Sequence, residues 1–194
     1  MKRGELLPDF MFETELGCRV AGVDEVGRGP LAGPVTAAAV VLDPKCIPEG
    51  LNDSKKLTAK KRLDLYRQLL DCADVSIAHA SVAEIDEINI LRASHLAMER
   101  AIAGLQVLPE HVLIDGNMIP RGLRLPATTL VKGDSRSISI SAASIVAKVC
   151  RDCVLVDLAQ QHPGYGWETN MGYGSKKHME ALRSLGVTSH HRCS

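Results

Sequence analysis

The sequence predicts an α/β fold whose sheet is at least partly parallel. Five short apolar segments of strand length are interleaved with longer segments of helical periodicity. No repeat and no linker-like tract divides the 194 residues, a length that can bury a substantial core. We therefore expect one domain over residues 1–194, with a C-terminal helical segment at about 163–194.

The first two predicted strands are joined by a glycine-rich loop. Val20–Glu25 is an apolar run that ends in two acids, and Val35–Leu42 is a second run expected to form a hairpin with it. The loop between them lacks the spacing of a nucleotide-binding loop and leads to a strand instead of a helix. It is expected to expose backbone groups and one arginine directly after the two acids.

The later elements follow from the same periodicities and from capping residues. Three more strands are predicted at Val75–Val82, His111–Gly116 and Ala127–Asp134. Helices are predicted at about 58–70 and 84–105, over Ala142–Gln161 and Ser175–Leu185, with a helical turn near Phe10–Leu16. Ser139 or Ser141 is the candidate N-cap of the long helix.

Composition and charge exclude several classes of protein. No apolar run approaches the roughly 20 residues that a membrane-spanning helix needs. The N-terminus lacks the apolar core of a signal peptide, so we expect a cytoplasmic protein. The six cysteines offer no second ligand pair for zinc and are expected to be reduced structural thiols.

The formal net charge is zero, but the basic residues are clustered. Six basic residues and one acid lie between Ser54 and Arg67. A second basic group near the end of the chain contains Lys176, Lys177, His178, Arg183, His190, His191 and Arg192. We expect the histidines among them to be exposed or to face phosphates. Such basic margins around an acidic centre suit a polyanion, although the neutral total counts against nucleic-acid binding.

Three apolar strands end in an aspartate, at Asp24, Asp115 and Asp134. If these strands are parallel neighbours, their carboxylates converge at one edge of the sheet, beside Glu25. Clustered carboxylates repel one another unless cations neutralise them, and hard oxygen ligands favour Mg²⁺ or Mn²⁺. Two such ions about 3.5–4 Å apart hydrolyse phosphodiesters in many enzymes. The sequence therefore predicts a two-metal phosphodiesterase.

Two of these assignments have alternatives. Neighbouring residues of a strand point to opposite faces, so Glu25 either turns toward Asp24 near Gly27 or forms an ion pair on the outer face. Asp152 competes with Asp134 for the fourth position. An ion pair with Lys148 one helical turn earlier accounts for Asp152 adequately, so Asp134 is preferred.

The ordered motifs resemble those of the type 2 ribonucleases H of bacteria over about residues 20–192. The motifs that carry the resemblance are Ala21-Gly-Val-Asp-Glu-Val-Gly-Arg-Gly-Pro-Leu-Ala-Gly-Pro34, Leu51-Asn-Asp-Ser-Lys-Lys-Leu57, Glu84-Ile-Asp-Glu-Ile-Asn-Ile-Leu91, Val112-Leu-Ile-Asp-Gly-Asn117, Val131-Lys-Gly-Asp134, Ser141-Ala-Ala-Ser-Ile-Val-Ala-Lys-Val149, Gly172-Tyr-Gly174 and His190-His-Arg192. The resemblance implies an RNase H-like fold, with a five-stranded mixed sheet flanked by helices and a helical C-terminal part.

The resemblance also implies an activity and a set of site residues. The activity is cleavage of RNA in RNA–DNA hybrids and 5′ of single ribonucleotides in duplex DNA, leaving 5′-phosphate and 3′-hydroxyl ends. The implied roles are Mg²⁺ or Mn²⁺ binding by Asp24, Glu25, Asp115 and Asp134, reading of the ribose 2′-hydroxyl by Gly27, Arg28 and Gly29, packing on the next deoxyribose by Tyr173, and a backbone contact by Lys55. We expect a monomer. A DNA nuclease of the same fold and a non-catalytic hybrid-binding module are the alternatives.

Overall fold

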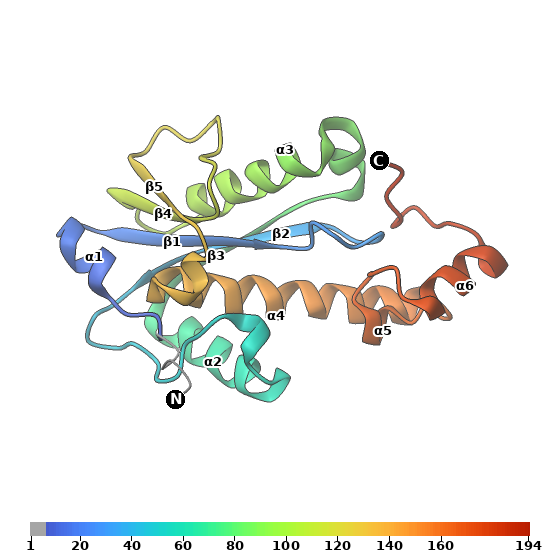
Figure 1. The fold of residues 1–194 in the computed structure, drawn as a ribbon, viewed down its shortest axis with the longest axis horizontal. Coiled ribbons are helices and arrows are strands. Elements are labelled where there is room, and N and C mark those ends of the chain that lie inside the picture. Colours follow the sequence, from blue (N-terminus) through green and yellow to red (C-terminus); the bar gives the residue numbers. More distant parts are fainter. Residues whose placement is uncertain (1–6) are drawn as a thin grey trace, which may run out of the picture.

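The computed structural model describes residues 7–194. Residues 1–6, part of the N-terminal stretch that lacks a signal-peptide pattern, lie outside the described residues. Five strands form one mixed sheet in the order β3-β2-β1-β4-β5 (Figure 1). Their bounds are Val20–Val26 for β1, Val35–Leu42 for β2, Ala73–Ala80 for β3, His111–Asp115 for β4 and Ala127–Leu130 for β5. The expected five-stranded α/β fold is confirmed.

The pairing of the strands decides where the acids lie. β1 and β2 form the predicted antiparallel hairpin, and β3 adds to β2 in antiparallel register. β4 runs parallel to β1, and β5 runs parallel to β4. The carboxyl ends of these three strands therefore meet at the same edge of the sheet, as expected for the strands that precede the aspartates.

Helices cover both faces of the sheet (Figure 1). α3 (Val82–Ala103) packs on one face, where Val23, Ala39 and Ile102 belong to one buried apolar cluster. α4 (Ile138–Gln161) and α2 (Ala59–Cys72) cover the other face through a second cluster that includes Leu65 and Ile145. Because both faces are covered, β2 is buried along its whole length and reads as a continuous apolar run.

α4 crosses β1 at very short range. A Cβ atom at Gly22 would overlap the backbone of Ser139, so the helix can lie this close only because β1 has a glycine there. The N-cap of α4 is Ser137, whose Oγ accepts a hydrogen bond from the amide of Ile140 at 3.3 Å. The expectation of Ser139 or Ser141 as the cap is wrong, because both lie within the buried first turn of the helix.

The fifth strand is shorter than predicted. β5 ends at Leu130, and Asp134 lies beyond it in a 3₁₀ turn, η2 (Gly133–Ser135), rather than at the strand end. Lys132 turns the chain there with a φ of 55°. A second 3₁₀ turn, η1 (Ser54–Lys56), precedes α2, and a short helix, α1 (Met11–Leu16), precedes β1.

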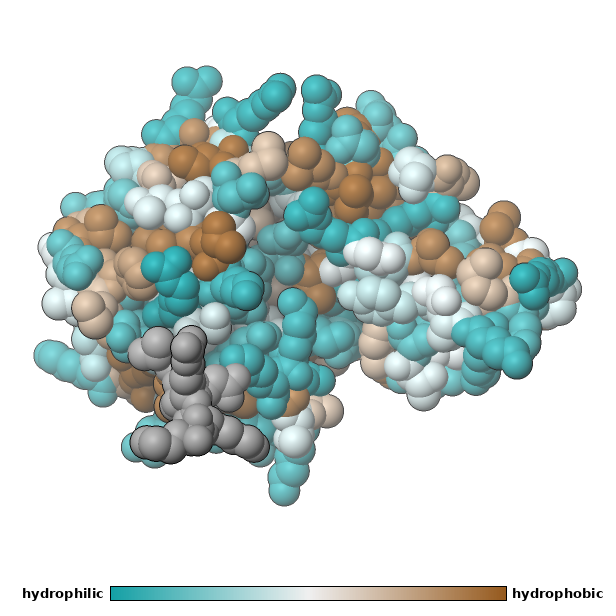
Figure 2. Space-filling model, in the orientation of Figure 1, coloured by the Kyte–Doolittle hydropathy of each residue, from teal (hydrophilic) through white to brown (hydrophobic). Residues whose placement is uncertain are grey.

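The C-terminal part is helical, as predicted. α5 (Trp167–Asn170) and α6 (Lys176–Leu185) pack beside the end of α4 around Leu155 and Trp167. Figure 2 shows this part as a lobe, separated by a notch from the region of α2. All six cysteines are free. No helix within residues 7–194 is long and apolar enough to span a membrane.

Candidate active site

One cavity of about 400 Å³ lies at the carboxyl ends of β1 and β4. Every residue that the sequence singled out for a site lines it: Asp24, Glu25, Gly27, Arg28, Gly29, Lys55, Asp115, Asp134 and Tyr173. These residues come from five separate segments, namely β1 with its following loop, η1, the end of β4, η2 and the segment between α5 and α6. Val26, Ser54, Ser144 and Lys148 complete the lining.

Asp24 is the most buried of the four acids, with 9% of its surface exposed. Its Oδ1 accepts a hydrogen bond from the amide of Glu25 at 2.7 Å. Burial is the main cause that raises the pKa of Asp24 well above its ordinary value, and the charges of Glu25, Asp115 and Asp134 add to it. These acids are therefore close enough to repel one another in this pocket.

Of the two alternatives for Glu25, the structure supports the first, in which its side chain turns toward Asp24, and its ion pair lies at the cavity instead of on the outer face. It lines the cavity with Asp24, and it also forms an ion pair with Arg28 at 3.4 Å. Burial raises the pKa of Glu25, while the charge of Arg28 lowers it and that of Asp115 raises it. The long side chain thus lies near both the other acids and the arginine of the loop.

Asp115 and Asp134 are brought together by the turn after β5. The amide of Gly133 donates a hydrogen bond to Asp115 Oδ1 at 2.7 Å, which fixes η2 against the end of β4. Burial, with the neighbouring charges of Asp53 and Asp115, raises the pKa of Asp134 to about 6, and the charge of Lys55 opposes this rise. Asp134 thus reaches the site from a turn instead of from a strand.

Sequence reasoning missed Asp53 as a neighbour of the acids. Its Oδ1 accepts a hydrogen bond from the amide of Lys55 at 2.9 Å, and its side chain is hydrogen-bonded to that of Asp134. The signal was present in the motif of residues 51–57, but an aspartate before a serine reads first as a cap. Asp152, the rejected competitor, pairs with Lys148 at 2.7 Å, as expected.

Two arginines hold the Gly27–Gly29 loop and the segment after it, the fully buried Arg151 and the partly buried Arg192. The sequence pointed to Arg192 only as part of a basic group and a motif, and it did not point to Arg151. Arg192 donates hydrogen bonds to the carbonyl oxygens of Gly27 (2.6 Å), Arg28 (3.1 Å) and Gly33 (2.8 and 3.0 Å). Arg151 is fully buried and donates to the carbonyls of Ala32, Pro34 and Met171 at 2.9–3.0 Å. A Cβ atom at Gly27, where φ is 97°, would overlap the Arg151 side chain. The glycine is therefore required by this packing as well as by its backbone conformation.

Tyr173 is held through its carbonyl by a histidine that was expected at the surface. His178 is fully buried, and its Nδ1 lies 2.9 Å from the Tyr173 carbonyl, an acceptor only, so Nδ1 carries the proton. Its Nε2 then accepts from the Trp167 indole at 3.1 Å and lies 3.1 Å from Nε2 of His191. His191 is also buried, so for these two the expectation of exposed or phosphate-facing histidines is wrong.

The acids of the cavity suit divalent cations chemically. Four carboxylates face it, while the cations beside them are Arg28, Lys55 and Lys148, of which Arg28 and Lys148 are already paired with acids. Within residues 7–194, no three His, Cys, Asp or Glu side chains are arranged so that they could hold a metal ion as they stand. An open set of carboxylates is what Mg²⁺ uses when water and a substrate phosphate complete its coordination.

Comparison with known proteins decides the family. The model of the family described as ribonuclease HII matches residues 21–194. The chain belongs to the ribonuclease HII family. It is 71% identical over 174 residues to ribonuclease HII of Roseobacter denitrificans, an alignment that covers 90% of this chain and 88% of the relative. It is 66% identical over 196 aligned positions to ribonuclease HII of Ruegeria pomeroyi, covering 99% and 84%.

Solved structures agree with this assignment. RNase HII of Archaeoglobus fulgidus, determined in complex with PCNA, superposes with a TM-score of 0.76 at 26% identity and covers 90% of this chain and 94% of its own. Ribonuclease H2 of Pyrococcus horikoshii gives 0.74 at 30% identity, covering 90% and 92%. As a member of the ribonuclease HII family, the protein is a metal-dependent hydrolase that acts on the RNA of RNA–DNA hybrids.

Proposed function

We propose that the protein cuts duplex DNA on the 5′ side of a single embedded ribonucleotide, as well as the RNA strand of longer hybrids, by two-metal catalysis. The products carry 5′-phosphate and 3′-hydroxyl ends. In this proposal Asp24, Glu25, Asp115 and Asp134 hold Mg²⁺ or Mn²⁺. The proposal rests mainly on one observation: the four acids line the same cavity as the Gly27–Gly29 loop and Tyr173.

The acids supply the cation-binding part of the reaction. Burial and the charges of the other three acids all raise the pKa of Asp24, so each of the three acts on it. When bound, two divalent cations activate a water molecule on one side of the scissile phosphodiester and stabilise the leaving oxygen on the other. The protein's part is to hold the carboxylates in place, which it does for Asp115 through the amide of Gly133.

The loop and the tyrosine supply the recognition of ribose. A 2′-hydroxyl both donates and accepts hydrogen bonds, so backbone amides and carbonyls can read it where no side chain stands in the way. Gly29 leaves the backbone bare beside Tyr173, where a Cβ atom would make an ordinary van der Waals contact with the ring at 3.5 Å. Arg192 engages the carbonyls of Gly27 and Arg28, which aims the remaining polar groups of the loop.

Two substrates test the specificity. A labelled DNA duplex with one ribonucleotide is incubated with and without Mg²⁺ beside the same duplex made only of DNA. We expect metal-dependent cleavage of the first alone, at the 5′ side of the ribonucleotide. Equal cleavage of both duplexes would instead indicate a DNA nuclease, and binding without metal-dependent cleavage would indicate a hybrid-binding module.

Asp24→Asn tests the role of the acids. The neutral amide keeps the shape of the side chain but is a poor ligand for Mg²⁺. We expect the variant to lose cleavage while its affinity for the ribonucleotide-containing duplex stays close to that of the wild type. Turnover at the wild-type rate would refute the assignment of Asp24.

A further inference from the structure

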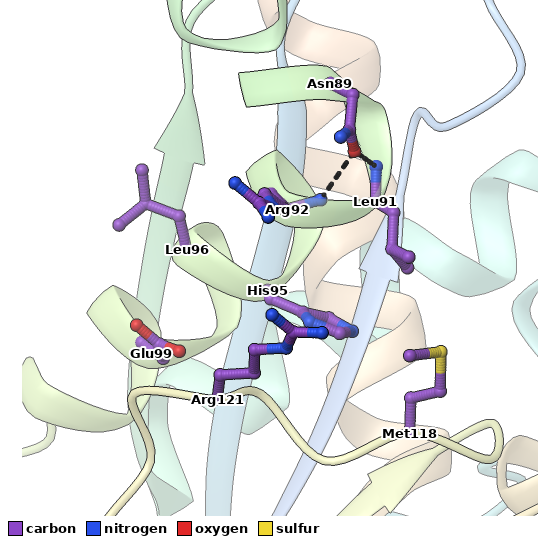
Figure 3. A pocket seen from close by; sticks show the side chains of 8 residues that line it. All are labelled: Asn89, Leu91, Arg92, His95, Leu96, Glu99, Met118 and Arg121. Atoms are coloured by element: carbon purple, nitrogen blue, oxygen red, sulfur yellow. Dashed lines mark hydrogen bonds between the residues drawn. The ribbon is translucent and has the colours of Figure 1, made fainter. Parts of the chain in front are cut away.

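A second cavity of about 400 Å³ lies on the α3 side of the sheet, between α3 and the connection from β4 to β5. It is lined by Asn89, Leu91, Arg92, His95, Leu96, Glu99, Met118 and Arg121. Figure 3 shows the Arg121 side chain reaching from the connection toward His95 on the helix. Arg92 lies three residues before His95, on the same face of α3.

In the described part of the chain, the guanidinium groups of Arg92 and Arg121 make no polar contact that stabilises the fold. Within residues 7–194, neither guanidinium group makes a hydrogen bond or an ion pair. The one acid of the lining, Glu99, accepts a hydrogen bond on Oε1 from the amide of Gly122 at 2.8 Å and keeps its charge in the cavity, where it raises the pKa of His95. The cavity therefore holds two guanidinium groups without a bonded partner among the described residues against one carboxylate, in contrast to Arg151 and Arg192, whose guanidinium groups are bonded to carbonyls.

A strained residue caps the part of α3 that carries Arg92. Asn89 has a φ of 68° inside α3, where it interrupts the helix. Its side-chain oxygen accepts hydrogen bonds from the amides of Leu91 (3.0 Å) and Arg92 (3.1 Å), and so caps the second part of the helix (Figure 3). A positive φ at a residue other than glycine costs about 1–3 kcal/mol and persists only where its surroundings hold it.

This cavity lies near the candidate active site, although the two share no lining residue. Arg28 lines the acidic cavity, and its charge also lowers the pKa of His95, as does that of Arg121, although burial is the larger cause. Arg121 follows Asp115 by six residues, a span of at most about 20 Å. Since a nucleic-acid strand rises about 3.4 Å per nucleotide, that distance corresponds to at most about six nucleotides.

We propose that Arg92 and Arg121 bind one backbone phosphate of the nucleic-acid substrate, within about six nucleotides of the cleaved bond. The inference rests on the proposed function, because it takes the acidic cavity as the place of cleavage. Acids at that cavity repel the phosphates on either side of the one that the cations hold. A pair of arginines a few nucleotides away offsets this repulsion and sets the register of the strand without reading its sequence.

The test measures binding by the double variant Arg92→Gln, Arg121→Gln. We expect its affinity for the ribonucleotide-containing duplex at 50 mM salt to fall by on the order of tenfold, as for the loss of charge-assisted hydrogen bonds. The slope of log affinity against log salt should become shallower by about 0.9, the value for one phosphate contact. Arg124→Gln is the matched control, because it removes the same charge from the same connection outside the cavity.

A second measurement locates the phosphate. Uncharged methylphosphonate linkages are placed one at a time along the duplex, and each duplex is bound to the wild type and to the double variant. The wild type should lose affinity at one position within about six nucleotides of the ribonucleotide, and the double variant should be insensitive at that position. The same sensitivity profile in both proteins would overturn the inference.

The design separates this inference from the proposed function. Binding is measured without Mg²⁺, so it does not depend on cleavage, and the cutting of the ribonucleotide-containing duplex is measured separately. Unchanged affinity and salt slope in the double variant, with cleavage by the wild type intact, would remove the phosphate site alone. Equal cleavage of the all-DNA duplex by the wild type would refute the proposed function. The binding measurements would then still decide whether the two arginines bind a phosphate.

Discussion

The acidic cavity and the loop held by arginines lie beside each other but differ in how their buried charges are paired. The buried carboxylate lies among other acids, whereas the buried guanidinium is hydrogen-bonded to carbonyls. Asp24 is almost buried among other carboxylates, and burial and repulsion both raise its pKa. Arg151 is fully buried, but three carbonyl oxygens accept its hydrogen bonds. A buried charge without a partner costs stability, whereas one whose donors are satisfied organises its surroundings. The first pattern marks a group kept for binding, and the second a group kept for structure.

The largest effect should be the loss of cleavage when the charge of Asp24 is removed. For Asp24→Asn we expect cleavage to fall by at least about 10³-fold, because an electrostatic contribution of several kcal/mol is lost. The same change should raise the Tm in EDTA, since it removes the repulsion among the acids. Differential scanning calorimetry with and without EDTA measures this second part. A lower Tm in EDTA would contradict the view that Asp24 is destabilising without a cation.

For Arg151 we expect the opposite effect on stability, a lower Tm when the charge is removed. Arg151→Met leaves the carbonyls of Ala32, Pro34 and Met171 without their donor, at a cost of about 3–5 kcal/mol. For a chain of this size the Tm should fall by about 6–20 °C. Arg67→Met, at an exposed position of α2, is the control and should change the Tm little. A Tm for Arg151→Met that equals the wild-type value would break the comparison.

An intermediate effect is expected at the histidine that holds Tyr173. His178→Ala removes the donor to the Tyr173 carbonyl and the partner of Trp167 and His191. We expect KM for the ribonucleotide-containing duplex to rise while kcat changes less, because the acids are untouched. His178→Asn retains a donor near the place of Nδ1 and should recover part of the loss in KM. Equal falls in kcat for both variants would show that the histidine does more than position the tyrosine.

The smallest effect concerns pH. The folded pKa of Asp134, about 6, lies above its ordinary value, so the folded protein binds the proton more tightly than the unfolded chain does. In EDTA, Asp134 therefore lowers stability as pH rises from about 4 to about 6, and its contribution stays constant above that range. The Tm of Asp134→Asn should exceed the wild-type Tm more at pH 7.5 than at pH 5. A difference that is the same at both pH values would refute the raised pKa.

The sequence indicated the acids well and the arginines poorly, for a physical reason. Asp24 and Asp115 end apolar strands, and strand ends are visible in a local pattern. Asp134 was predicted at a strand end and lies in a turn instead, because β5 stops four residues earlier. The prediction of its location in the strand was wrong, although the turn still brings it to the cavity.

A buried arginine depends on hydrogen-bond partners that are distant in the chain. Arg151 meets carbonyls more than a hundred residues away, which no local pattern reveals. One signal was available, since Arg151 lies on the buried stripe of α4 between Ala147 and Leu155. The sequence carried no signal for the burial of His178 and His191. A histidine in a basic segment has the same local pattern whether it is exposed or enclosed by Trp167 and Tyr165.

The central claim is that carboxylates from separate segments share divalent cations in the cavity at the ends of β1 and β4. The most direct measurement is anomalous scattering from crystals of the protein soaked with Mn²⁺. We expect anomalous peaks within about 2.5 Å of oxygens of Asp24 and Asp115, with Glu25 or Asp134 completing the sites. A map with no peak in this cavity, at a Mn²⁺ concentration that supports cleavage in solution, would contradict it.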